Sequence, residues 1–216
     1  ANNKKLKYVL FAMSSDEIDW LNGKFDHIPS IPGMFIFTYM KGAIGCDLWY
    51  GAFTEEYWKP EINIGRFSVN NTEQLQNVVD KTMHHHTRET NYWDNNTLMI
   101  GGSDIGFRYQ TEALLNNIKD SGNFISRLYV VQSSSDTIYY GTADTLASHF
   151  SKGLSYINFF GHGGGRVWED NGLLTFGSMN NLNNANKYPF ISSMSCHTGD
   201  FSYHKALSKQ MVNFPD

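Results

Sequence analysis

From residue 71 onward, apolar segments of strand length alternate with segments in which apolar residues recur at helical spacing. The strand-like segments cover residues 97–100, 127–131, 154–160 and 189–194. Helical spacing is found over residues 72–87, 109–118 and 142–151. Strands that alternate with helices in this way run parallel, because each helix returns the chain to the starting edge of the sheet. The pattern predicts an α/β fold: a mostly parallel sheet with helices on both faces.

The remaining segments are shorter or less regular. Residues 7–12 predict a buried strand, residues 34–39 a short edge strand and residues 62–67 a further strand. A short helix is predicted near residues 179–186 and a final helix over residues 201–212. No internal repeat, low-complexity tract or linker divides the chain, so we predict a single domain.

Charge and cysteine content exclude several classes of function. The net charge of −4 provides no basic patch for nucleic acid or for an anionic membrane. No apolar run approaches the roughly 20 residues that a membrane-spanning helix needs. The two cysteines, Cys46 and Cys196, do not form a disulfide framework, so the fold depends on a packed core. We expect no nucleic-acid partner and no transmembrane segment.

Two of the predicted strands end at residues that can carry out nucleophilic catalysis. His162 follows the strand over residues 154–160, and Cys196 follows the strand over residues 189–194. Neighbouring parallel strands bring their carboxyl ends to the same edge of a sheet. A cysteine beside a histidine at that edge supplies a thiolate and its base. The alternative is a buried structural cysteine, which is the commonest state of a free cysteine.

The neighbours of both residues favour the catalytic interpretation. A polar turn follows Cys196, and a helix is predicted to begin directly after it, so the helix dipole would favour the thiolate. Glycines flank His162, and they permit positive φ and a close approach of backbone N–H groups. The N–H groups of Gly163 and Cys196 are the candidate oxyanion hole. A phosphate-binding loop is the alternative, but these glycines lead into Arg166 and not into Gly-Lys-Ser/Thr.

Other candidate ligands are weaker. Three consecutive histidines, His84 to His86, lie within the predicted helix over residues 72–87. Consecutive side chains on a helix point in different directions, so they cannot chelate one ion together. We interpret them as a solvated helix face.

The histidine and cysteine motifs resemble those of the gingipain-like cysteine peptidases, peptidase family C25. The histidine motif is Gly-His-Gly at residues 161–163, followed by Trp168. The cysteine motif is Pro-Phe-Ile-x-x-x-x-Cys-x-x-Gly-Asp-Phe over residues 189–201. Upstream, residues 64–68 resemble the family's Ile-Gly-Arg-Phe segment, and residues 47–51 resemble an acidic-aromatic-glycine turn that precedes it.

This resemblance implies a caspase-like fold and the hydrolysis of peptide bonds through a thioacyl-enzyme. Cys196 would be the nucleophile and His162 the general base and acid, with the backbone of Gly163 and Cys196 stabilising the oxyanion. Family members also have an acidic residue that orients the histidine, for which Asp104 is the candidate. A solvated loop aspartate is an equally good interpretation of Asp104, because such turns favour Asp.

The expected substrate pocket departs from that of the arginine-type enzymes. Those enzymes use an acidic residue in the S1 pocket, and the corresponding region here reads Phe-Arg-Tyr-Gln at residues 107–110. This departure counts against a basic P1 residue in the substrate. Trp168 is the candidate pocket wall, and Asp170 or Glu169 is a candidate specificity residue. The resemblance implies no cofactor for catalysis, and it raises the expectation of structural calcium, although no acidic cluster indicates a site.

The resemblance also implies a protein or peptide substrate and a location outside a bacterial cell or on its surface. Export would use a type IX secretion system, whose components are then expected partners. Two other functions stay open: a sortase-like transpeptidase, and an inactive module of a secretion or motility complex. The family's catalytic unit begins earlier and continues further, so we expect residues 1–216 to be an incomplete catalytic domain.

Overall fold

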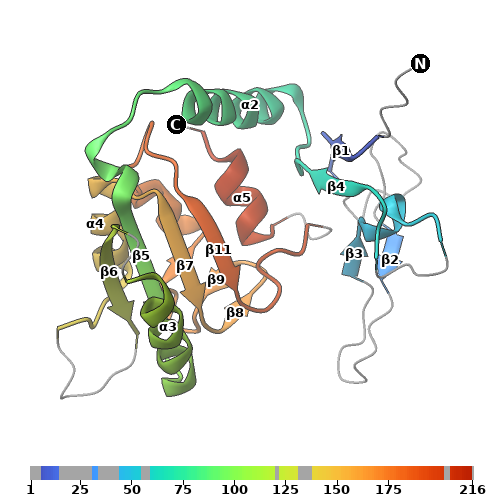
Figure 1. Cartoon of the computed structure of the whole chain (residues 1–216). Coiled ribbons are helices and arrows are strands. Elements are labelled where there is room, and N and C mark those ends of the chain that lie inside the picture. Colours follow the sequence, from blue (N-terminus) through green and yellow to red (C-terminus); the bar gives the residue numbers. More distant parts are fainter. Residues whose placement is uncertain are drawn as a thin grey trace. The chain divides into compact units, whose positions relative to one another are not determined.

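The computed structural model describes residues 6–14, 31–33, 44–54, 59–119, 122–130, 138–201 and 205–215. Contacts divide the chain into two compact units (Figure 1). One comprises Ala1–Val78 with Asp200–Pro215, and the other comprises Val79–Gly199. The candidate site residues all belong to the second unit.

The second unit is built on a parallel sheet of four strands in the order β11-β7-β5-β6 (Figure 1). The strands are β5 (Asn96–Gly101), β6 (Phe124–Tyr129), β7 (Tyr156–Phe160) and β11 (Phe190–Met194). Helix α3 (Ile105–Ile118) connects β5 to β6, and helix α4 (Ala143–Lys152) connects β6 to β7. Helix α2 (Thr72–Thr87) and the 3₁₀ helix η2 (Tyr92–Asn95) precede β5. The predicted α/β fold with a parallel sheet is confirmed.

The core of this unit lies around the two central strands. Leu98, Met99 and Ile100 of β5 and Ile157 and Phe159 of β7 are 0% exposed. Central strands of a parallel sheet are covered on both faces, which explains why these segments are mostly apolar and do not alternate between apolar and polar residues.

A smaller antiparallel sheet follows β7. It contains β8 (Gly163–Gly164), β9 (Val167–Trp168) and β10 (Leu174–Thr175), and the 3₁₀ helix η3 (Gly177–Asn181) comes next. The glycines after His162 therefore belong partly to a strand, where the sequence predicted a loop. The helix predicted near residues 179–186 is this shorter and tighter 3₁₀ helix.

The first unit contains two pairs of strands. β1 (Tyr8–Phe11) pairs in parallel with β4 (Asn63–Arg66), and β2 (Ile31–Gly33) pairs antiparallel with β3 (Ile44–Cys46). The 3₁₀ helix η1 (Leu48–Gly51) and helix α5 (Leu207–Asn213) complete its described elements.

An ion pair joins two of the upstream segments on which the family resemblance rests. Arg66 Nε lies 2.6 Å from Asp47 Oδ2, and the guanidinium lies against the rings of Phe11 and Phe201. Both charged side chains are largely buried, so removal of either partner would leave the other charge desolvated.

Three sequence predictions differ from the structure. The strand predicted over residues 7–12 is not buried: among the described strands β1 pairs with β4 alone, and Tyr8 is 72% and Leu10 56% exposed. The final helix begins at Leu207 instead of residue 201. Helix α3 begins at Ile105, four residues before the predicted start, because Asp104 caps it. The strand predicted over residues 34–39 lies outside the described residues.

Replacement of Leu98 by Ala should lower the free energy of unfolding by about 3 kcal/mol, because it leaves a cavity in the middle of the sheet. The matched control is Leu6→Ala, at a position that is 63% exposed, where the change should stay below about 0.5 kcal/mol. Urea unfolding of both variants measures the difference. Equal losses would contradict the placement of the core.

A charged network connects α3 to β6. Tyr129 Oη donates a hydrogen bond to Glu112, and Arg127 Nε donates a second one at 3.0 Å. Burial raises the pKa of the Glu112 carboxyl, but these hydrogen bonds and the charges of Arg127 and Arg108 outweigh burial, so its pKa lies below the ordinary value. Burial and the hydrogen bond to Glu112 raise the pKa of Tyr129 far above its ordinary value, so this phenol stays neutral.

The lowered pKa of Glu112 makes part of the stability dependent on pH. Its ionised form stabilises the fold above about pH 4.3, the ordinary pKa of Glu, and this contribution is lost as the pH falls through the lower pKa of the folded state. The difference in melting temperature between the wild type and Glu112→Gln should therefore narrow from about pH 6 to about pH 3. Glu89→Gln, at an exposed position, is the control and should track the wild type. A gap that stays constant with pH would contradict this assignment.

Candidate active site

Three adjacent strands of the second unit end at the same edge of the sheet. Met194 of β11 is the register partner of Phe160 of β7, and Phe160 is the partner of Gly101 of β5. His162 lies two residues after Phe160, and Cys196 lies two residues after Met194. The two residues therefore follow their neighbouring strands at corresponding positions. Both residues are exposed, and Cys196 is a free thiol. The structure thus places both residues just beyond the carboxyl ends of two neighbouring parallel strands, at one edge of the sheet.

Gly163 packs directly against the cysteine segment. A Cβ atom at Gly163 would lie 2.8 Å from the carbonyl oxygen of Cys196 and 2.9 Å from the Oγ of Ser195. Both distances are shorter than a real Cβ contact. Gly163 does not have a positive φ, so the position requires glycine for space and not for backbone conformation.

In the register of β8 with β9, the N–H of Gly163 forms no hydrogen bond within the three-stranded sheet. The N–H of Glu169 donates to the carbonyl oxygen of His162 at 2.9 Å, which makes these two residues a hydrogen-bonded pair. Pairs alternate along an antiparallel ladder, so the next pair, Gly163 with Trp168, is not hydrogen-bonded. The N–H of Gly163 therefore points away from β9. Among the described backbone groups, the N–H of Cys196 also lacks a hydrogen-bond partner.

Three hydroxyl groups support the turn that carries Cys196. The Oγ atoms of Ser193 and Ser195 and the Oγ1 of Thr198 lie 2.9 to 3.1 Å from one another. Trp168 Nε1 donates a further hydrogen bond to Ser193 Oγ at 3.0 Å. His197 has a φ of 57°, a left-handed conformation that costs a non-glycine residue energy and persists only where neighbouring contacts enforce it.

The expected helix dipole at Cys196 is wrong. Residues 195–201 form bends and turns, and the next helix among the described residues is α5, which begins at Leu207. The turn after β11 therefore provides no helix dipole for the thiol of Cys196.

His162 is held by its backbone and by a ring contact. Its N–H donates to Glu169 Oε1 at 2.7 Å, and its imidazole meets the ring of Phe107 edge-on, with centroids 5.0 Å apart. Within the described part of the chain, the imidazole forms no hydrogen bond with Cys196 or with Asp104. Apo active sites often show such open geometry and tighten when substrate binds.

Asp104 is the N-cap residue of helix α3. Its Oδ1 accepts a hydrogen bond from the N–H of Gly106 at 2.9 Å at the start of α3, and the residue is exposed. This position agrees with the second interpretation of Asp104, a turn aspartate. A role in orienting His162 stays a prediction.

The three candidate pocket residues differ in their exposure to solvent. Trp168 is 1% exposed and stacks on Phe159 with centroids 4.5 Å apart, so it belongs to the core and cannot form an open wall. Glu169 is also 1% exposed, and its carboxylate accepts a hydrogen bond from the N–H of Ser103. Asp170 is exposed and is the one of the three that stays available to substrate.

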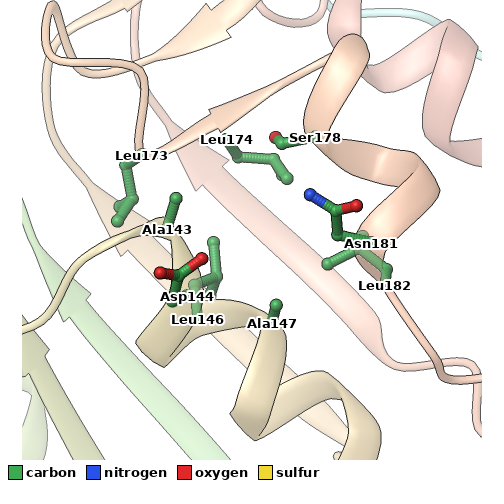
Figure 2. Close-up of a pocket in the computed structure, with 9 residues that line it drawn as sticks. All are labelled: Ala143, Asp144, Leu146, Ala147, Leu173, Leu174, Ser178, Asn181 and Leu182. Carbon is green, nitrogen blue, oxygen red and sulfur yellow. The ribbon is translucent and has the colours of Figure 1, made fainter.

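A small hollow lies elsewhere in this unit, between α4 and η3 (Figure 2). Leucines and alanines form most of its lining, and Asp144, Ser178 and Asn181 add polar groups. None of the candidate catalytic residues lines it.

The described residues contain no cluster of metal ligands and no membrane-spanning helix. No three His, Cys, Asp or Glu side chains among them lie close enough to share a metal ion. The expectation of structural calcium is left without a test. His84 packs edge-on against Tyr188, whereas His85 and His86 are exposed. None of the described helices combines the length and the hydropathy of a membrane span.

The whole chain, residues 1–216, matches the profile of peptidase family C25. The chain belongs to this family. Gingipain R2 of Porphyromonas gingivalis (strain ATCC BAA-308 / W83) is 27% identical over 172 residues, which are 74% of this chain and 22% of gingipain R2. Lys-gingipain W83 of Porphyromonas gingivalis is 27% identical over 163 residues, which are 73% of this chain and 9% of that protein.

A solved structure shows the same fold. The crystal structure of the Arg-specific cysteine proteinase gingipain R matches this chain with a TM-score of 0.75 and 22% identity, over 100% of this chain and 46% of that one. The gingipain-like fold and family that the motifs indicated are therefore confirmed. The chain spans about a fifth of gingipain R2 and less than half of the solved relative.

The cap role of Asp104 can be separated from a role in orienting His162. Asp104→Ala should lower the free energy of unfolding by about 1 kcal/mol, whereas Asp104→Asn should change it little, since Asn caps helices about as well as Asp. Chemical unfolding measures both values. An unchanged stability in Asp104→Ala would contradict the cap. A stable Asp104→Asn variant with reduced kcat on a peptide substrate would support the orienting role.

Proposed function

We propose that this chain hydrolyses peptide bonds as a cysteine peptidase, with Cys196 as the nucleophile and His162 as the general base and acid. The observation that carries the proposal is the level placement of the two exposed side chains at the ends of paired strands. Membership of peptidase family C25 supports the reaction class.

The proposed reaction proceeds in two halves. His162 takes the proton of the Cys196 thiol, and the thiolate attacks the carbonyl carbon of the scissile peptide bond. The C–N bond then breaks as His162 gives the proton to the leaving amine, and a thioester to Cys196 remains. His162 then takes a proton from a water molecule, and the resulting hydroxide attacks the thioester. The C–S bond breaks, the carboxylic acid is released, and His162 returns the proton to the thiolate of Cys196.

Backbone N–H groups supply the oxyanion site in this proposal. The N–H of Gly163 points away from β9, and that of Cys196 is unused by the described backbone. In the proposed reaction, both donate to the carbonyl oxygen of the substrate as it gains negative charge on attack by Cys196. Preorganised donors of this kind are worth about 3 kcal/mol each in the transition state. The close packing of Gly163 on the cysteine segment supports this arrangement.

We also propose that the P1 preference is not basic. The segment beside His162 on α3 contributes Phe107, which contacts the imidazole, and Arg108, whose guanidinium lies 4.9 Å from the centroid of the Tyr129 ring. The acidic residue of α3, Glu112, already accepts hydrogen bonds from Tyr129 and Arg127. The relative described as Arg specific therefore does not predict the specificity of this chain.

The proposal predicts that Cys196→Ala abolishes turnover of a peptide library, because no other group in the site can form the thioester. His162→Ala should slow alkylation of Cys196 by a peptidyl probe about 10²-fold, the usual effect of a positioned base. Mass spectrometry reads both the cleavage products and the alkylated residue. Cys46→Ala is the matched control and should behave as the wild type.

Two results would overturn this function. Unchanged turnover in Cys196→Ala would exclude the proposed nucleophile. Slow alkylation of Cys196 that is unaffected by His162→Ala would indicate an inactive module in which no dyad is assembled. Products that carry an added amine would instead identify a transpeptidase.

A further inference from the structure

The buried carboxylate of Glu169 binds the backbone of the proposed catalytic histidine, His162. Glu169 is 1% exposed, and its two oxygens accept three hydrogen bonds from two different strand ends. Oε1 accepts the N–H of His162 at 2.7 Å. Oε2 accepts the N–H of Ser103 at 3.0 Å and the hydroxyl of Ser103 at 2.6 Å. A carboxylate is costly to bury unless such donors satisfy it, so this contact is specific.

The two strand ends are shaped around this carboxylate. A Cβ atom at Gly102, after β5, would lie 1.9 Å from Glu169 Oε1, and one at Gly161, after β7, would lie 2.4 Å from the same oxygen. Neither glycine has a positive φ, so what both positions require is the absence of a side chain. The sequence thus provides space for Glu169 at both neighbouring residues.

The backbone of Glu169 holds the same histidine a second time. Its N–H donates to the carbonyl oxygen of His162 at 2.9 Å, so Glu169 binds both backbone polar groups of that residue. Its φ is 61°, a left-handed conformation that costs a residue with a Cβ about 1 kcal/mol or more. The side-chain contacts explain how this conformation is maintained.

We propose that Glu169 is a positioning residue for the reaction: it fixes the backbone of His162 at the ends of β5 and β7 and thereby sets the imidazole relative to Cys196. The inference rests on the proposed function. The carboxylate of Glu169 binds the backbone N–H of His162 and forms no hydrogen bond with the imidazole or with the thiol of Cys196, so in this proposal it acts through the position of His162.

The proposal predicts a loss in kcat with little change in KM. A displacement of a catalytic group by about 1 Å costs on the order of 10²-fold in rate. Glu169→Ala removes all three side-chain hydrogen bonds, and kcat should fall about 10²-fold. Glu169→Gln keeps one acceptor for the N–H of His162 but sets its NH₂ against the N–H of Ser103, so kcat should fall only about tenfold. KM should stay within about twofold in both variants. Glu89→Gln, at an exposed position, is the matched control.

The alkylation rate of Cys196 in double variants separates positioning from general destabilisation. Glu169→Gln should slow alkylation in the wild-type background and have no further effect in the His162→Ala background, because its action passes through His162. Circular dichroism and chemical unfolding confirm that each variant is folded, and Glu169→Gln carries the test if Glu169→Ala does not fold.

Three outcomes would overturn the inference. An unchanged kcat in folded Glu169→Gln would exclude positioning. Equal slowing of alkylation in both backgrounds would show that Glu169 acts on the cysteine turn or on the fold. If His162→Ala itself leaves alkylation unchanged, the proposed function fails, and the inference fails with it. The first two results leave the proposed function intact.

Discussion

Strand β7 pairs with β11 on one side and with β5 on the other, and this double register determines where every residue of the site lies. Phe160 is level with Met194 and with Gly101, so the segments that begin at Gly161, Ser195 and Gly102 leave the sheet at the same height. A shift of one residue would move His162 about 3.3 Å along the strand and turn its side chain to the opposite face. The complete burial of Ile157 and Phe159 opposes such a shift, because it would replace them in the core with neighbours of different shape.

Close packing and backbone strain are concentrated where the strands end. At Gly102, Gly161 and Gly163 the neighbouring atoms leave no space for a Cβ. Glu169 and His197 have positive φ. Such conformations persist when the surrounding contacts determine them from several sides. Here the carboxylate of Glu169 holds one side of the site, and the hydroxyl cluster of Ser193, Ser195 and Thr198 holds the other. Because no helix begins at Cys196, the proposed activation of its thiol relies on His162 and on backbone groups and not on a helix dipole.

The sequence predicted the parts of the site that depend on local pattern. Strand periodicity and the glycines around His162 were sufficient to place His162 and Cys196 at one edge. Asp104 shows the limit of such reasoning, because a capping aspartate and a catalytic aspartate look alike when a strand, a glycine turn and a helix follow one another. The contacts of Glu169 could not be predicted, since its partner Ser103 lies 66 residues away and no local pattern connects them. Trp168 was misplaced for a similar reason: its stacking on Phe159 depends on how β9 folds back over β7.

The four residues after Ile100 show how closely stability and the proposed chemistry are connected. Gly101 ends β5 level with Phe160, Gly102 leaves space for the carboxylate, and Ser103 donates two hydrogen bonds to it. Asp104 then begins α3, and that start determines where Phe107 meets the imidazole. A substitution in this turn therefore changes the fold and the position of His162 together. Loss of activity alone cannot identify a catalytic residue there, and a separate readout of the position of His162, such as the alkylation rate of Cys196, is needed to distinguish the two roles.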